Sequence, residues 1–158
     1  DNRLNMIHEG THGIQAMDLL GRKVLMENGR GLQLLAGRIN ATIERAIQQP
    51  ALAPHANALA KALARVGAVT KAAWATGNPT EALANAVPYM QAFGHVVIAW
   101  TWLELALVAG AAKTEAAAQG VASATRYFYH YELPRIEAWL RVVESRDMTC
   151  ADMAEHAF

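Results

Sequence analysis

The residues best suited to chemistry lie near the start of the sequence, where residues 8–12 read His-Glu-Gly-Thr-His. An amphipathic helix is predicted from about residue 13 to residue 27, because apolar residues recur at three- and four-residue steps. These are Ile14, Met17, Leu20 and Val24. Thr11 fits the N-cap position, so Glu9 would lie beside the unpaired backbone N–H groups of the helix N-terminus. Such a carboxylate either caps the helix or acts as a base, and the spacing alone does not choose.

Residues 8–12 also match the zinc-peptidase pattern H-E-x-x-H, in which two histidines on one helix face bind zinc and the glutamate is the general base. Gly10 is a poor residue inside a helix, costing about 1 kcal/mol relative to alanine. Gln15 and Asp18 stand where the extended pattern has glycine and histidine. A third ligand would have to come from Glu27 or Glu44. The sequence favours the interpretation without metal and keeps a zinc peptidase as an alternative.

Two longer stretches carry a resemblance to a known family. The first consists of Glu9-Gly10-Thr11, then Ile14-Gln15, then residues 18–23, Asp-Leu-Leu-Gly-Arg-Lys. The second is residues 85–94, Asn-Ala-Val-Pro-Tyr-Met-Gln-Ala-Phe-Gly, followed by Trp100. Together they resemble the C-terminal part of the acyl-CoA dehydrogenases, in particular the longer bacterial members of the methylmercaptopropionyl-CoA dehydrogenase type, which have an extra helical domain at the C-terminus.

This resemblance implies a catalytic role for the first stretch. Glu9 would remove the α-proton of an acyl-CoA thioester while a hydride leaves the β-carbon for FAD. Gly10 would line the substrate, and Thr11, His12 and Gly13 would lie against FAD. Because the α-carbon is a weak acid, such a base should be desolvated so that its pKa rises toward the working pH.

The resemblance also implies the surroundings of the reaction. The parent protein would be an FAD-dependent oxidoreductase of fatty acid metabolism that passes electrons to electron-transfer flavoprotein. It would be a cytoplasmic homo-oligomer.

The domain organisation is predicted from a turn signal at Asn28-Gly29. Residues 1–29 would be the remnant of a catalytic helical domain, and residues 30–158 the extra helical domain. The chain starts at Asp1 without methionine and has no G-x-G-x-x-G phosphate loop. We therefore expect a fragment that is inactive alone, with a non-catalytic helical interaction module as the alternative function.

Composition narrows the class of protein. The 158 residues are 53% hydrophobic, which is enough for a core, and the 14 basic and 14 acidic residues balance. This neutrality gives no reason to expect nucleic acid or an anionic membrane as a partner. Cys150 is the single cysteine, which excludes an internal disulfide and fits a reducing compartment. No signal-peptide pattern is present.

Helical periodicity predicts an all-α, up-and-down bundle with antiparallel neighbours. Its long helices are expected at about residues 31–48, 54–75, 88–112 and 113–131, with shorter ones at 80–86, 134–144 and 150–156. Thr80 and Thr149 are the expected caps of the first and last of these short helices.

Three features inside the bundle need interpretation. The run 96–112 is long enough to raise a membrane span, but Glu104 in its middle favours the central helix of a bundle, with Arg126 as the expected partner of that buried carboxylate. The aromatic segment 127–131, with Phe128 and Tyr131 inward, is expected to fill one end of the bundle. His55, His95, His130 and His156 share no metal-ligand spacing.

Overall fold

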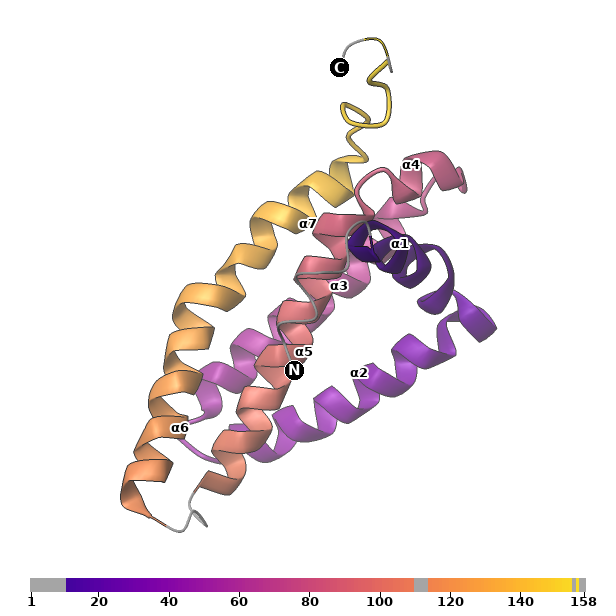
Figure 1. Ribbon diagram of the computed structural model, residues 1–158. Helices are drawn as coiled ribbons and strands as arrows, with labels where there is room; N and C mark the ends of the chain where they lie inside the picture. The colour runs from indigo at the N-terminus through magenta and orange to yellow at the C-terminus, as the bar shows by residue number, and fades with distance from the viewer. Residues whose placement is uncertain (1–10, 110–113, 155, 157–158) are drawn as a thin grey trace.

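The computed structural model describes residues 11–109, 114–154 and 156, and in these residues the chain is helical with no strand. Long helical stretches pack side by side with short connections, so the predicted all-α bundle is confirmed (Figure 1). They are α2 (Met26–Ile47), α3 (Ala53–Ala73), α5 (Ala86–Val108) and the pair α6 (Glu115–Tyr127) and α7 (Ile136–Ser145). Short connections make consecutive helices antiparallel, which is the up-and-down arrangement.

The N-terminal helix lies across one end of this bundle. It consists of α1 (Thr11–Asp18) and a π-helical turn, η2 (Leu19–Lys23). It ends where Glu27, Asn28 and Gly29 take left-handed backbone conformations, with φ of 50°, 55° and 81°. Glycine has no Cβ to oppose this conformation and asparagine tolerates it better than most residues. The break predicted at Asn28-Gly29 is therefore confirmed, and it starts one residue earlier, at Glu27.

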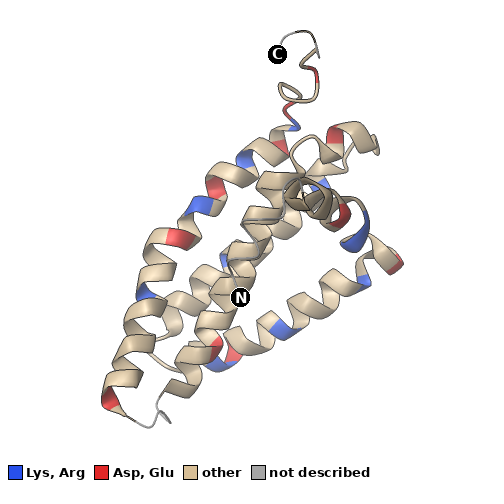
Figure 2. Cartoon of the chain, viewed as in Figure 1, with Lys and Arg blue, Asp and Glu red and all other residues tan. Residues whose placement is uncertain are grey.

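Helix α5 is the centre of the bundle, and α1, α2, α3, α6 and α7 all pack against it. Tyr89, Ala92, Val96, Ala99 and Leu103 of this helix are buried. Charged side chains lie mainly on the surrounding helices (Figure 2). By length and composition α5 could also cross a membrane, but helices at the core of bundles have the same properties.

Buried hydroxyl groups on and around α5 have hydrogen-bond partners. Tyr89, which is fully buried, shares a 2.7 Å hydrogen bond with the Thr70 hydroxyl of α3. Burial raises the pKa of Tyr89 to about 12. Tyr129 donates to the backbone carbonyl of Ala99 at 3.0 Å. These bonds satisfy polar groups whose unpaired burial would be costly.

The partner predicted for Glu104 is wrong. The Glu104 carboxylate pairs with Arg45 of α2 and accepts a hydrogen bond from the Thr42 hydroxyl, which in turn accepts the indole N–H of Trp100 at 2.7 Å. The Glu104 side chain is 36% exposed, so it is less buried than expected. Helix α2 lies on this side of α5, and the packing order of helices, which periodicity does not encode, decided the pairing.

The predicted fifth helix differs because a second π-helical turn, η4 (Phe128–Glu132), follows α6. A π turn holds an extra residue, so both Phe128 and Tyr129 point inward and the residues after them change phase. Tyr131 is therefore 67% exposed and stacks on Tyr127, with ring centroids 5.1 Å apart, instead of pointing inward. A 3-10 turn, η5 (Leu133–Arg135), then leads into α7, so that α6 and α7 follow one another as a nearly continuous helix (Figure 1).

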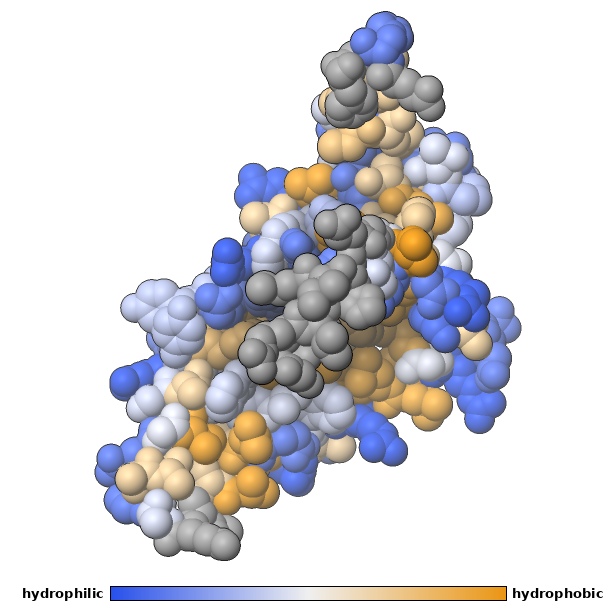
Figure 3. Space-filling model, in the orientation of Figure 1, coloured by the Kyte–Doolittle hydropathy of each residue, from blue (hydrophilic) through white to orange (hydrophobic). Residues whose placement is uncertain are grey.

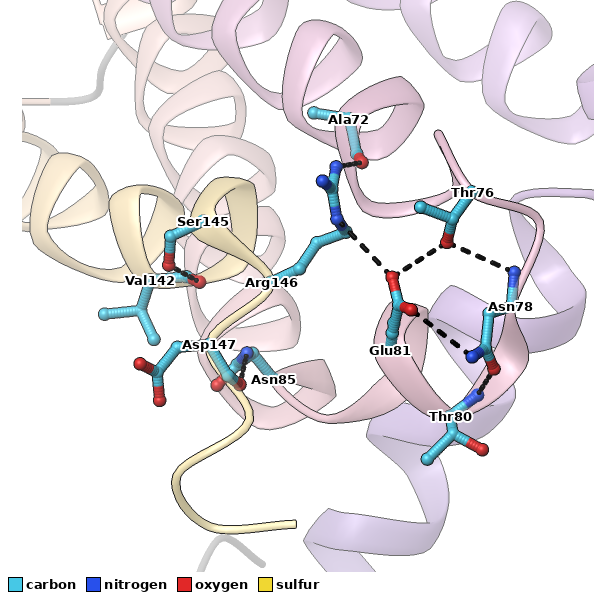
Figure 4. Close-up of polar contacts among 10 residues, drawn as sticks. All are labelled: Ala72, Thr76, Asn78, Thr80, Glu81, Asn85, Val142, Ser145, Arg146 and Asp147. Atoms are coloured by element: carbon cyan, nitrogen blue, oxygen red, sulfur yellow. Dashed lines mark hydrogen bonds and ion pairs between the residues drawn. The ribbon is translucent and has the colours of Figure 1, made fainter. Parts of the chain in front are cut away.

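One end of the bundle is closed by polar contacts around the short helix α4 (Pro79–Leu83) (Figure 4). Asn78, not Thr80 as predicted, is the N-cap, and its side chain accepts the Thr80 N–H at 3.0 Å. Arg146 donates to the Ala72 carbonyl at 3.1 Å, and the buried Asn85 donates to the Asp147 carbonyl at 2.8 Å. Asn85 thus joins the start of α5 to the end of α7.

The last predicted helix is replaced by a turn in the described part of this segment. The Thr149 N–H donates to the Asp147 carboxylate at 3.0 Å, and the Asp152 N–H donates to the Met148 carbonyl at 2.8 Å. The predicted N-cap, Thr149, is therefore wrong, and the Asp147 side chain instead accepts a hydrogen bond that stabilises this turn.

The orientation of α5 predicts that alanine substitution of two leucines, two residues apart, will have very different effects on stability. Leu103 is fully buried, and Leu103→Ala should lower the free energy of unfolding by about 2–5 kcal/mol because it leaves a cavity. Leu105 is 42% exposed, and Leu105→Ala should change it by about 0.5 kcal/mol. Urea denaturation of the two variants measures both values, and equal losses would contradict this orientation of α5.

Candidate functional site

The structure places part of the predicted catalytic segment. The described part of α1 begins with Thr11, His12 and Gly13, of which His12 is exposed and the other two are half-buried. Glu9 and Gly10, the predicted base and substrate contact, lie outside the described residues, as does His8 of the zinc-peptidase pattern. The three predicted FAD contacts thus lie next to one another at the beginning of the described part of α1.

The face of this segment that packs on the bundle differs from the predicted one. Leu20 and Val24 are buried as predicted, together with Ala16. Ile14 and Met17, which were predicted to lie on the same apolar face, are 67% and 48% exposed. Residues 16, 20 and 24 are four apart, so the buried stripe is narrower than the apolar stripe of the sequence.

The exposed side of α1 borders an open groove of about 580 Å³. Its lining residues are Ile14, Gln15, Asp18, Leu19, Arg22, Lys23 and Met90. Arg22 and Asp18 form an ion pair at 2.5 Å, and hydrogen bonding to this guanidinium lowers the pKa of the Asp18 carboxyl. The groove is therefore apolar at Ile14 and Met90 and charged at the end near η2.

The π turn η2 holds the segment to the bundle through a carbonyl that it leaves free. In an α-helix the Leu20 carbonyl would accept the Val24 N–H, but in η2 that N–H bonds to Leu19 at 3.0 Å. The Leu20 carbonyl instead accepts the indole N–H of Trp74, at the end of α3, at 3.2 Å. This bond links the candidate catalytic segment to α3.

The π turn η2 also packs closely against the short helix α4. A Cβ added at Gly21 would lie 3.2 Å from the Leu83 side chain of α4. Glycine therefore lets η2 approach α4 closely. Together with Leu20, Gly21 explains the Leu-Leu-Gly part of the sequence stretch 18–23 as packing against the bundle.

The described side chains of this segment therefore hold it against the bundle, but among themselves they do not form a complete reaction centre. Trp74 and Leu83, which hold the segment, were missed by the sequence analysis. No sequence signal gives the hydrogen-bond partner of Trp74, because the free Leu20 carbonyl exists only once the π turn has formed.

His55, His95, His130 and His156 were predicted to share no metal site, and two of them, His55 and His130, lie near one another in the structure. His55 of α3 lies over the Tyr129 ring, with centroids 4.6 Å apart, and its ring centre is 6.3 Å from that of His130. Among the described residues, no three His, Cys, Asp or Glu side chains gather in a way suited to a metal ion. Burial first, and repulsion from His130 second, lower the pKa of His55 below its ordinary value of 6.5.

The bond to the Leu20 carbonyl predicts an effect of Trp74→Phe. The aromatic ring is kept but the carbonyl loses its donor, so the free energy of unfolding should fall by about 1–3 kcal/mol. Hydrogen exchange of amides in α1 and η2 should also become faster relative to that of α7. Trp102→Phe is the control, because the Trp102 indole has no hydrogen bond to a described residue. Unchanged exchange in η2 would contradict the role given to Trp74.

The pKa of His55 predicts a dependence of stability on pH. Because the folded-state pKa lies below the unfolded-state value, the unfolded chain binds more protons in the window below about pH 6.5, and stability falls as the pH decreases through it. Thermal unfolding from pH 7.5 to pH 5 measures this. His55→Gln should make the decrease shallower, whereas the exposed His156→Gln should leave it unchanged. An equal slope in the wild-type chain and His55→Gln would show that His55 is not the cause.

A comparison with protein families finds a match to the model described as "Acetyl-CoA dehydrogenase C-terminal like" over residues 35–154. The match covers α2 from Leu35, all of α3 to α7 and the turn after α7. It therefore spans most of the helical bundle.

Two curated proteins are similar to the chain. The "3-methylmercaptopropionyl-CoA dehydrogenase" of Ruegeria pomeroyi is 39% identical over 123 residues, which are 76% of this chain and 20% of that protein. The "Broad-specificity linear acyl-CoA dehydrogenase FadE5" of Mycobacterium tuberculosis is 26% identical over 173 aligned residues, covering all of this chain and 28% of that protein. The chain thus spans about a fifth to a quarter of these relatives. From the family match across α2 to α7 and the first of these similarities, the chain belongs to the acyl-CoA dehydrogenase family, and it corresponds to the C-terminal helical part of such proteins.

Proposed function

We propose that the chain is the C-terminal part of an FAD-dependent acyl-CoA dehydrogenase and contributes the catalytic base, Glu9. The observation that carries this proposal is the 39% identity to a protein named as a 3-methylmercaptopropionyl-CoA dehydrogenase. The sequence supports it, since Glu9 is followed by Thr11, a residue type suited to cap the N-terminus of a helix. A carboxylate near a helix N-terminus is close to backbone N–H groups that can orient it.

The chemistry assigned to Glu9 is a proton transfer from carbon. Its carboxylate takes the α-proton of the thioester, and the electron pair of that C–H bond forms the α,β double bond as a hydride leaves the β-carbon. FAD, when bound, supplies the acceptor for this hydride. Desolvation of Glu9 by substrate and cofactor would raise its pKa and strengthen it as a base.

The residues proposed to contact FAD fit a contact but do not form a binding site by themselves. Among the described residues, no atom lies within 4 Å of a Cβ added at Gly13, and His12 is exposed, so the described part of α1 leaves room for a ligand there. Nothing in the first turn of α1 encloses a cofactor. We therefore propose that the 158 residues alone do not retain FAD and are inactive, and that the rest of the site comes from polypeptide corresponding to the other parts of the relatives.

The remaining parts of this assignment are proposals of the same kind. Residues 1–29 would belong to the catalytic unit and residues 30–158 to the additional helical domain, with the left-handed break at Glu27–Gly29 between them. The parent enzyme would oxidise an acyl-CoA, transfer electrons to electron-transfer flavoprotein, and act as a homo-oligomer in the cytoplasm. A zinc peptidase stays the less favoured alternative, and metal analysis of the purified chain distinguishes the two.

The test is Glu9→Gln in the full-length protein encoded by the gene from which this chain comes. The amide cannot accept the α-proton, so anaerobic bleaching of the flavin by an acyl-CoA should slow by about 10²–10⁴-fold while the FAD content is unchanged. Glu115→Gln is the matched control, because Glu115 is an exposed carboxylate in the first turn of α6. Normal bleaching by Glu9→Gln would show that another residue is the base.

A further inference from the structure

Helix α5 is almost entirely apolar, yet the second half of one of its faces is exposed. Val96 and Leu103 are buried in the core. Residues two positions further along a helix lie about 200° around its axis, on the opposite side. There Ile98, Leu105 and Val108 are 45%, 42% and 59% exposed. With the exposed Thr101 between them, these residues form what we call the open face of α5: Ile98, Thr101, Leu105 and Val108.

Contacts with two neighbouring helices mark the edges of the open face. On one edge the Glu104 carboxylate pairs with Arg45 of α2. On the other edge the Trp102 carbonyl accepts the Thr125 hydroxyl of α6 at 3.4 Å. The face itself contains no Asp, Glu, Lys or Arg, and hydrophobic surface is visible over the last turns of α5 (Figure 3). The open face is therefore an uncharged, mostly apolar strip between α2 and α6.

The spacing of this strip favours another helix as the element that covers it. Its four residues follow one another in steps of three, four and three, and the same alternation continues toward the start of α5 with Gly94 and Gln91. Such steps place side chains in a line along a helix, which is how two helices pack along one another. A Cβ added at Gly94 would meet no atom within 4 Å, so a neighbour can approach closely there. A strand is not favoured, because the N–H and C=O groups of a helix interior already bond to each other.

The comparisons indicate where such a helix would come from. The chain corresponds to 20% and 28% of the two similar proteins, so most of the length of each lies outside the match. Helix α1, which the proposed function assigns to the catalytic unit, already packs against α5. It does so at the first half of α5, where Met90 borders the groove of α1. The open face is thus the continuation of a helix that the catalytic segment already contacts.

We propose that the open face of α5 is an internal interface of the parent enzyme, covered by an α-helix of the polypeptide outside these 158 residues. Helix α1 packs on the first half of α5 and this further helix on the second half. Helix α5 then joins the additional helical domain to the catalytic unit along its whole length. The inference rests on the proposed function in one respect, that the chain is part of a longer enzyme, and it uses neither Glu9 nor FAD.

The test places a carboxylate on the open face in two proteins, the 158-residue chain and the full-length protein encoded by its gene. In the chain, Leu105→Glu puts the charge in water, so the unfolding temperature should change by less than about 2 °C. In the full-length protein the same carboxylate is buried without a partner, and the unfolding temperature should fall by about 5 °C or more. Ile98→Glu should give the same pair of results. The measurement in the chain also shows that each substitution is compatible with folding.

Val142→Glu is the matched control, because Val142 is 40% exposed and lies on α7 instead of the open face. It should change the unfolding temperature little in both proteins. Hydroxyl-radical labelling of the unsubstituted proteins measures the same coverage directly. Labelling of Leu105 relative to Val142 should fall several-fold from the chain to the full-length protein.

Two results would overturn the proposal. The first is a small shift by Leu105→Glu in both proteins together with unchanged labelling, which would mean that the face stays in water. The second is dissociation of the full-length protein by Leu105→Glu in sedimentation velocity, which would assign the open face to a second copy; the expected result is an unchanged sedimentation coefficient. Failure of the proposed base would appear separately, in flavin bleaching by Glu9→Gln, which none of these measurements uses.

Discussion

The apolar side chains of α5 must be shielded from water by neighbouring helices, and this requirement shapes the whole bundle. This helix contains one Asp, Glu, Lys or Arg residue, Glu104, in 23 residues, so neighbours must cover it on most sides. Helices α2, α3, α6 and α7 do so, and α1 covers its first half. Alanines such as Ala92 and Ala99, both fully buried, let these neighbours approach closely. Glu104 is tolerated because Thr42 and Arg45 meet its carboxylate where it approaches solvent.

The two π turns decide how the segments that carry polar and aromatic side chains meet this core. In η2 the turn leaves the Leu20 carbonyl free for Trp74, and in η4 it brings Phe128 and Tyr129 inward together. The first turn makes the bundle a support for the segment that includes Thr11 and His12. Leu20 and Val24 belong to the same core as residues of α3 and α5, so the position of α1 depends on its packing against these helices. The break at Glu27–Gly29 changes the direction of the chain before α2, and a cavity of about 510 Å³ lies between η2 and the first half of α2.

The stretch 85–94, which carries much of the family resemblance, stabilises contacts between helices. Asn85 joins α5 to the end of α7, Tyr89 bonds to Thr70 of α3, and Phe93 packs against the core. A stretch of sequence can thus identify a family because it fixes helix contacts, while the chemistry is carried by another stretch. For this chain we propose residues 9–13 as that other stretch, of which the described part begins at Thr11.

Most helix positions, the break at Asn28-Gly29 and the family could be predicted from the sequence, because periodicity, turn residues and long motifs are local properties. The partner of Glu104, the direction of Tyr131, the exposure of Ile14 and Met17, and the role of Trp74 were known only from the packing of the helices. Each of these depends on which helices are neighbours or on a π turn that shifts the helical phase. A change of phase by one residue moves a side chain by about 100° around the helix axis, and local sequence does not record it.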